Sequence, residues 1–151
     1  MKAFKVYAIK NGTVIDHVPA RKGIQIIERL KLLDHENIVT LGIGFSSKRM
    51  GSKDVVKIED KELTSNEVNQ VAMIAPEATL NIIRNYKLKK KIKIRIPKVL
   101  KSILRCPNPS CVTNHESVES RFLRVNGKDR PYTFKCVYCQ HVFIRSELSF
   151  V

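Results

Sequence analysis

The chain contains four cysteines, and they occur as two close pairs in its last third. Cys106 and Cys111 frame the sequence CPNPSC, and Cys136 and Cys139 frame CVYC about 25 residues later. Two short knuckles let four thiolates approach one tetrahedral cation, and this ligand set is typical of zinc. The alternatives are four buried free thiols or an iron–sulfur cluster, although no redox-partner motif accompanies the cysteines.

A complete set of four cysteine ligands indicates a structural metal, because a catalytic zinc usually keeps three protein ligands and one open position. The last part of the chain also needs a metal for its stability, since a unit of about 50 residues buries little apolar surface. His115 and His141 lie close to the knuckles, either as substitute ligands or as surface histidines. We therefore expect one structural Zn²⁺ per chain, held by the four cysteines.

The sequence before the first knuckle alternates between strand and helix patterns. It predicts helices over 20–33 and 64–75, a polar loop over 46–53, and strands over 4–10, 13–18, 38–45, 55–59, 78–84 and 87–96. Thr64 and Glu67 form a capping box for the second helix, and Pro76 ends it. This order predicts a ferredoxin-like α+β sandwich, with a helix layer on a mostly antiparallel sheet.

Pro97 ends the last of these strands, and a linking segment over 98–105 leads to the first cysteine. Short strands around 119–125, 132–136 and 142–148 then predict a small antiparallel β domain, with a hairpin turn at Asn126-Gly127. We therefore expect two domains, 1–97 without metal and 98–151 with zinc.

The chain is strongly basic, with 28 Lys and Arg against 14 Asp and Glu and a net charge of +14. This balance favours polyanionic partners, although salt-loving or heat-loving cells also make charge-rich proteins. The segment 84–105 has ten basic residues and no acidic one. Because successive strand residues face opposite sides, alternate cations of this segment would share one face of a strand, although Lys90 interrupts the alternation. Such a basic face could bind phosphates, or it could protect a sheet edge from aggregation. That face comprises Lys87, Lys89, Lys91, Lys93 and Arg95.

The sequence favours binding over chemistry. In Asp16-His17, the aspartate can accept a hydrogen bond from a ligand hydroxyl and the histidine can donate one to a phosphate. Alternatively, the two side chains only satisfy each other's hydrogen bonds in a turn. We find no glycine-rich phosphate loop, catalytic triad spacing or paired carboxylates, which argues against a free-standing enzyme. Nothing resembles a signal peptide and no apolar run is long enough to span a bilayer, so we expect a cytoplasmic protein without a membrane partner.

Several longer segments are more specific than a spacing pattern. They are NGTVIDHVP (11–19), MGSKDVVKIE (50–59), APEATLNIIRNY (75–86) and CPNPSCVTN (106–114), followed by CVYC. Together they resemble one family, the regulatory chain of aspartate carbamoyltransferase. The resemblance covers essentially the whole chain in order. It implies a non-catalytic subunit of a pyrimidine-biosynthesis complex.

The resemblance also implies partners and binding residues. The first domain would bind CTP as inhibitor and ATP as activator and would pair with a second regulatory chain, while the zinc domain would dock on the catalytic chain. The complete assembly would hold six chains of each kind. The implied nucleotide contacts are Asp16 and Lys57 for ribose and base, His17, Asn81 and Lys91 for the triphosphate, and the backbone near Ile9 and Tyr86 for the base edge.

A zinc-ribbon protein that binds nucleic acid is the competing class. A basic strand and a zinc unit can bind phosphate backbones with a steep dependence on salt. The chain has few aromatic residues for base stacking, 7% in all, and no tryptophan. We therefore expect nucleotides and protein chains as partners, and no nucleic acid.

Overall fold

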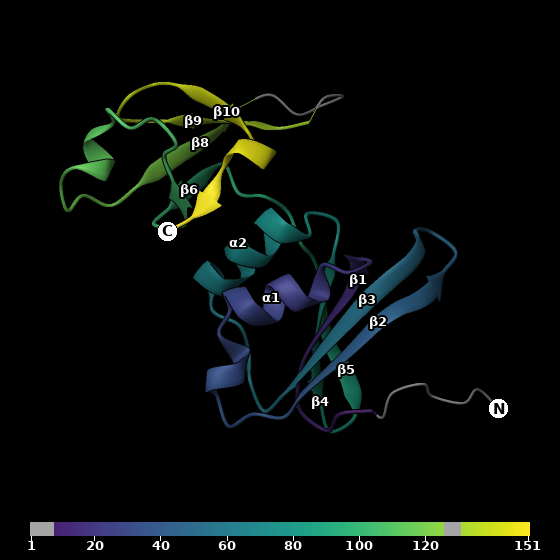
Figure 1. Cartoon of the computed structure of the whole chain (residues 1–151). Helices are drawn as coiled ribbons and strands as arrows, with labels where there is room; N and C mark the ends of the chain where they lie inside the picture. Colours follow the sequence, from purple (N-terminus) through teal and green to yellow (C-terminus); the bar gives the residue numbers. More distant parts are fainter. Residues whose placement is uncertain (1–7, 126–130) are drawn as a thin grey trace. The chain divides into compact units, whose positions relative to one another are not determined.

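The computed structural model describes residues 8–125 and 131–151 (Figure 1). The chain divides into two compact units, Met1–Arg95 and Ile96–Val151, and each is described by itself. The first unit combines helices with a five-stranded sheet, and the second is built from short antiparallel strands. The prediction of an α+β fold is therefore confirmed.

The sheet of the first unit has the strand order β2-β3-β1-β4-β5, and all neighbouring strands are antiparallel. A helix follows β1, and a second helix follows β3, so the unit has the split β-α-β pattern of the predicted ferredoxin-like sandwich, with one further edge strand. Its elements are β1 (Gly12–Pro19), α1 (Gly23–Arg29), β2 (Val39–Ser47), β3 (Gly51–Glu59), α2 (Ser65–Ile74), β4 (Thr79–Arg84) and β5 (Lys87–Lys93).

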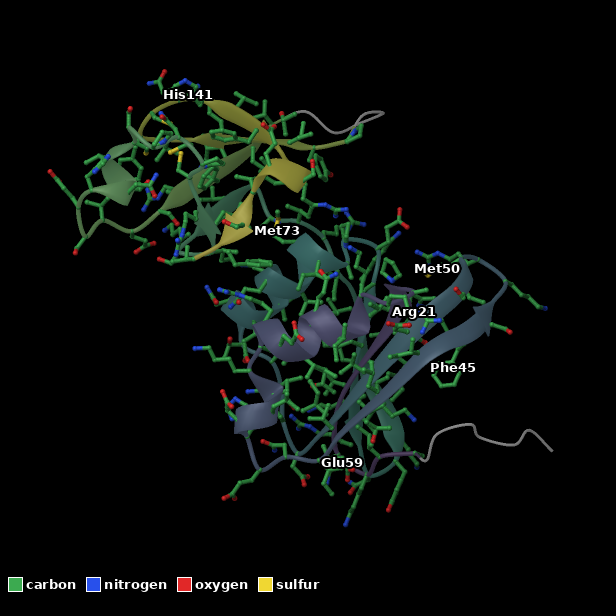
Figure 2. The ribbon with its side chains drawn as sticks, viewed as in Figure 1. Arg21, Phe45, Met50, Glu59, Met73 and His141 are labelled. Carbon is green, nitrogen blue, oxygen red and sulfur yellow. The ribbon has the colours of Figure 1, made fainter. Side chains whose placement is uncertain are left out.

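Both helices lie on the same face of this sheet (Figure 1). Alternate side chains of the strands point toward them, because successive strand residues face opposite sides. The resulting core is mostly apolar and closed to solvent. Its central members are Ile15, Ile26, Val56, Ile58, Val71 and Leu80. Within the first unit, no helix among the described residues covers the other face of the sheet, on which Phe45 of β2 lies (Figure 2).

The two helices begin and end for different reasons. Thr64 Oγ1 accepts a hydrogen bond from the Glu67 amide at 3.2 Å, and Glu67 Oε1 accepts one from the Thr64 amide at 3.0 Å, so the predicted capping box is confirmed. The first predicted helix is shorter than expected. After α1, Lys31 adopts a left-handed conformation with φ 54°, and a separate 3-10 helix, Leu32–Asp34, follows. A left-handed residue cannot continue the α-helical hydrogen bonds.

Three further predictions about the chain were wrong or fall partly outside the description. The predicted loop over 46–53 is a hairpin instead, because β2 and β3 pair through Ser47 and Gly51. The linking segment over 98–105 contains two strands, β6 (Val99–Lys101) and β7 (Leu104–Arg105). Residues 4–7 of the first predicted strand lie outside the described residues, and residues 8–10 are not in a strand.

The second unit is the predicted small antiparallel β domain. Its main sheet has the order β10-β9-β8-β6, and β11 (Ser149–Phe150) pairs with β7. The remaining strands are β8 (Arg121–Val125), β9 (Thr133–Cys136) and β10 (Val142–Ile144). Leu100, Phe122 and Phe134 form its buried centre. The predicted hairpin turn at Asn126-Gly127 lies outside the described residues.

Candidate functional site

The four cysteines of the second unit converge on one point. Their sulfur atoms all lie within 4.8 Å of one another. The Sγ atoms of Cys106 and Cys139 are 3.7 Å apart, and so are those of Cys111 and Cys136. Four sulfurs around a tetrahedral cation at about 2.3 Å would be separated by about 3.8 Å, whereas a disulfide bond is about 2.05 Å. The cluster therefore fits a four-thiolate metal centre.

Hydrogen bonds within the first knuckle hold this geometry. The Asn114 side-chain amide donates to the backbone oxygen of Cys106 at 2.9 Å and to that of Asn108 at 2.8 Å. Thr113 Oγ1 lies 3.1 Å from Cys111 Sγ. Such outer contacts orient ligands before a metal binds. The sequence between and after the first two cysteines thus builds the knuckle from its own side chains.

The second knuckle favours a thiolate at its last cysteine. Burial alone would raise the pKa of Cys139, but the His141 backbone amide and the Asn108 side chain, with other nearby hydrogen bonds, lower the pKa to about 6. Burial raises the pKa of Cys106.

His115 and His141 are not members of the sulfur cluster; the His115 ring contacts a backbone oxygen of the first knuckle at 2.6 Å.

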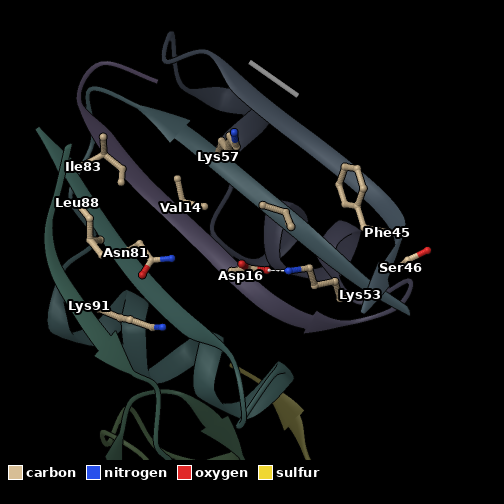
Figure 3. Close-up of a pocket in the computed structure, with 11 residues that line it drawn as sticks. Val14, Asp16, Phe45, Ser46, Lys53, Lys57, Asn81, Ile83, Leu88 and Lys91 are labelled. Atoms are coloured by element: carbon tan, nitrogen blue, oxygen red, sulfur yellow. Dashed lines mark ion pairs between the residues drawn. The ribbon is translucent and has the colours of Figure 1, made fainter. Parts of the chain in front are cut away.

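A second candidate site lies in the first unit, on the sheet face without helices. It is a shallow pocket of about 580 Å³ that spans all five strands (Figure 3). Apolar side chains form much of its floor, and lysines and one aspartate stand around it. The lining residues are Val14, Asp16, Phe45, Ser46, Lys53, Val55, Lys57, Asn81, Ile83, Leu88 and Lys91. This mixture suits a ligand with an apolar ring and negative charge.

Strand register brings the polar groups together. Lys91 on β5 lies opposite Asn81 on β4, and Asn81 lies opposite Val14 on β1. On its other side, Val14 lies opposite Lys57 on β3. Cross-strand neighbours share a face of the sheet, so residues far apart in the sequence form one row across the pocket. Ile83 and Leu88 form the next row toward the turn between β4 and β5.

Asp16 sits beside an irregularity in β1. The strand contains one extra residue between Ile15 and Val18, where the register shifts, and His17 has a left-handed φ of 57°. Asp16 Oδ1 accepts a hydrogen bond from the His17 amide at 2.6 Å and lies 2.9 Å from Lys53 Nζ. Burial would raise the pKa of the Asp16 carboxyl, but these contacts and the Lys53 and His17 charges hold it below its ordinary value.

Two other pocket residues are partly withdrawn from solvent. Burial lowers the pKa of Lys57, although the Asp16 charge opposes the shift. Asn81 Oδ1 is buried and has no hydrogen-bond partner among the described residues. A buried polar atom without a partner is costly unless a ligand or water supplies one.

Three of the implied nucleotide contacts do not line the pocket. His17 follows the lining residue Asp16 in the sequence, and its Nδ1 lies 2.5 Å from Thr79 Oγ1. The Ile9 side chain is buried, and Tyr86 is largely exposed in the turn between β4 and β5. The Tyr86 amide donates to the Lys10 backbone oxygen at 2.9 Å, so the two backbone segments lie side by side at the Ile83 and Leu88 end of the pocket.

The predicted basic face of five cations was wrong. β5 has one extra residue, Lys89, opposite the step between Ile82 and Ile83. This bulge reverses the alternation, because each added residue turns the following side chains to the other face. Lys91 therefore shares the pocket face with Leu88, while Lys87 lies on the opposite face with Lys90.

Lys53 and Phe45 line the pocket although neither was expected from the sequence. They lie opposite one another on β3 and β2. Lys53 falls in the segment that was predicted to be a loop, so its face could not be assigned. The MGSKDVVKIE segment contained the signal, since Lys53 and Lys57 are four residues apart and share a strand face.

Both units match models of one family. Residues 4–95 match the aspartate carbamoyltransferase regulatory chain, allosteric domain, and residues 98–149 match the metal binding domain of the same chain. This chain belongs to the aspartate carbamoyltransferase regulatory chain family. It is therefore a non-catalytic subunit with an allosteric domain and a metal-binding domain.

Full-length relatives of this regulatory chain agree. Each is named aspartate carbamoyltransferase regulatory chain. The relative from Pyrococcus abyssi is 46% identical over 150 residues, which cover 98% of this chain and 97% of the relative. That from Methanothermobacter thermautotrophicus is 44% identical over 146 residues, 96% and 92% of the two chains. That from Photobacterium profundum is 43% identical over 141 residues, which cover 93% of this chain and 91% of the relative. No helix among the described residues is long and apolar enough to cross a membrane.

Proposed function

We propose that the open sheet face of the first unit binds CTP as an inhibitor and ATP as an activator of the catalytic chain. The observation that supports this most is the gathering of Asp16, Lys57, Asn81 and Lys91 around one pocket from four different strands. An ionised carboxylate accepts hydrogen bonds from ribose hydroxyls, and lysines pair with phosphates. The pocket thus offers both kinds of contact that a nucleotide needs.

We propose one direction for the nucleotide in this pocket. The base would lie near Ile83 and Leu88, where backbone groups close to Ile9 and Tyr86 can read its edge. Asp16 and Lys57 would then hold the ribose and base. The triphosphate would meet Lys91, Asn81 and His17.

We propose that the metal is zinc, one ion per chain. The sulfur separations of 3.7 Å support this choice, since four thiolates are the usual ligands of a structural zinc. The ion would hold the second unit in the shape that docks on the catalytic chain. Reduced thiols of this kind also fit a cytoplasmic protein.

Two regulatory chains would pair through the first unit, as a homodimer. The two edges of its sheet support β2 as the contact. β5 is an edge strand rich in lysine, which disfavours strand pairing, whereas β2 at the other edge exposes Ile43. We expect Ile43→Lys to shift sedimentation toward monomers, with Val142→Lys in the second unit as the control. An unchanged dimer would contradict the contact at β2.

Regulation requires two states of the assembly that differ in nucleotide affinity. We propose that CTP and ATP favour different states of catalytic trimers bridged by regulatory dimers. The test is co-purification with the catalytic chain, followed by activity assays with each nucleotide. Recovery of a complex that CTP inhibits and ATP activates is expected. A catalytic chain that does not co-purify would contradict the proposed role.

The nucleic-acid alternative loses support from the bulge in β5. Lys87 and Lys90 lie on the face opposite Lys91, so the continuous basic surface expected from the sequence is divided. A gel shift titrated with salt and a CTP titration on the same protein separate the two functions. Tight, salt-sensitive binding of nucleic acid without CTP binding would favour the alternative.

A further inference from the structure

We propose that Asp54 is a positioning residue for the nucleotide pocket, although its side chain lies on the opposite face of the sheet. From there it holds the bulge in β2 that places Phe45 on the pocket face, beside Lys53. The inference rests on the proposed nucleotide site and adds to it a residue that does not contact the ligand.

Asp54 is an unusual residue in the core. It lies on β3 between the sheet and the helix layer, and its side chain is fully buried. Oδ2 accepts a hydrogen bond from the Gly23 amide at the start of α1 at 3.0 Å, and Oδ1 accepts one from the Gly44 amide of β2 at 3.1 Å. A buried carboxylate is costly unless such donors satisfy it. Asp54 therefore ties α1 and β2 to β3.

The segment of β3 around Asp54 is flanked by irregularities on both sides. β1 has an extra residue between Ile15 and Val18, opposite the step from Val56 to Asp54. β2 has an extra residue between Gly42 and Phe45, opposite the step from Val55 to Lys53. In β2, Gly44 has a left-handed conformation with φ 76°, and its amide donates the hydrogen bond that Asp54 Oδ1 accepts.

The bulge in β2 decides which way Phe45 points. Gly42 lies opposite Val55 on the pocket face, and Phe45 lies opposite Lys53 on the same face (Figure 3). Without the extra residue, alternation would turn Phe45 to the helix side. The Phe45 ring packs over Gly42, where a Cβ atom would come within 1.9 Å of the ring.

Phe45 and Ser46 line the β2 side of the pocket, and Lys53 lies opposite Phe45 on β3. Cross-strand neighbours on one face are close enough for their side chains to interact, so the ring should limit the positions of the Lys53 side chain. Lys53 Nζ in turn pairs with Asp16 at 2.9 Å. A change at Asp54 would therefore reach the ribose contact through Gly44, Phe45 and Lys53.

Asp54→Asn tests this chain of contacts, because the amide keeps the shape but leaves one backbone donor facing an NH₂ group. Gly44→Ala provides a second variant that leaves the Asp54 side chain in place and adds no clash, since a Cβ there meets no atom within 4 Å and only the left-handed φ is strained. Gly51→Ala is the matched control, with φ 79° and equally open space, but at the hairpin turn and outside the bulge.

The measurements are CTP affinity by calorimetry, with all variants well below their melting temperatures, and the nuclear Overhauser contact between the Phe45 ring and Gly42 without nucleotide. We expect Asp54→Asn and Gly44→Ala each to weaken CTP binding by about tenfold and to lose the ring contact. Gly51→Ala should do neither. Combining Asp54→Asn with Phe45→Ala should weaken binding no further than Phe45→Ala alone, because both changes act through one side chain.

The outcomes separate the inference from the site itself. Unchanged CTP affinity in both variants, or fully additive effects with Phe45→Ala, would overturn the positioning role. A wild-type chain that does not bind CTP would instead contradict the proposed function. In that case the ring contact still decides whether Asp54 positions Phe45, and its persistence in both variants would overturn the inference.

Discussion

Asp16 is the residue on which the proposed nucleotide site depends most. It lies in the irregular part of β1, where its carboxylate accepts a hydrogen bond from the His17 amide and lies 2.9 Å from Lys53 Nζ. Its ionised form is stabilised because nearby donors and positive charges outweigh the cost of burial. A carboxylate held ionised and only partly exposed is well suited to accept hydrogen bonds from ribose hydroxyls.

The lowered pKa of Asp16 predicts a pH-dependent contribution to stability. Because the folded-state pKa lies below the ordinary value of 3.8, the contribution is complete above that value. It is lost as the pH falls through the folded-state pKa. We expect Asp16→Asn to lower the free energy of unfolding near neutral pH, by a difference that shrinks in acid. Urea unfolding from pH 7 to about 3 measures this.

Lys53→Met is the companion variant, because it removes the main positive partner of Asp16 and keeps an apolar stem. It should reduce the same pH dependence while leaving the carboxyl in place. A difference between wild type and Asp16→Asn that grows toward low pH would contradict the assignment.

At the scale of elements, local signals were predictable from the sequence and cross-strand signals were not. The capping box of α2 and the two cysteine knuckles depend on residues close in sequence, and both formed as expected. The bulge at Lys89 in β5 depends on pairing with β4, and the bulge in β2 depends on Asp54, ten residues away from Gly44. Periodicity assumes regular strands, so it assigned the lysines to the wrong faces and missed Phe45.

The turn between β4 and β5 offers a test of local strain. Asn85 and Tyr86 both have left-handed φ values, 50° and 64°. Such two-residue hairpin turns favour Asn-Gly, because glycine adopts positive φ without a Cβ penalty. We expect Tyr86→Gly to raise the free energy of unfolding by about 1 kcal/mol. Chemical denaturation measures this change in the free energy of unfolding.

Tyr86→Phe is the control for the ring itself, since it keeps the side-chain bulk and the strain. It should leave the stability near that of the wild type. If Tyr86→Gly proves less stable than Tyr86→Phe, packing of the exposed ring outweighs the turn conformation, and the strain argument fails.

At the scale of the whole molecule, the chain separates two tasks. The first unit has a conventional apolar core and an open sheet face, whereas the second has a small core of Leu100, Phe122 and Phe134 beside the sulfur cluster. A small domain gains much of its stability from a structural metal, on the order of 10 kcal/mol for zinc. The metal would therefore stabilise the second unit, whereas the proposed nucleotide pocket is lined by residues of the first.

Removal of the metal should affect the two units differently. We expect Cys139→Ser, or mercurial treatment, to unfold the second unit and release catalytic trimers, while CTP binding to the first unit persists. Sedimentation of the complex and calorimetry on the same sample measure both effects. Ser110→Ala, in the first knuckle but not a ligand, is the control. An intact assembly after metal loss would rule out a metal-dependent docking surface.

The most direct test of a nucleotide sensor joined to a separate catalytic chain is the CTP response of the reconstituted holoenzyme. Asp16→Ala and Lys57→Ala should assemble normally with the catalytic chain and keep its basal activity, because neither residue lies in the metal-held unit. Activity measured against CTP concentration should show inhibition of the wild-type assembly and a response shifted at least tenfold in both variants. Variants that respond to CTP as the wild type does would contradict the assignment of the effector site to this sheet face.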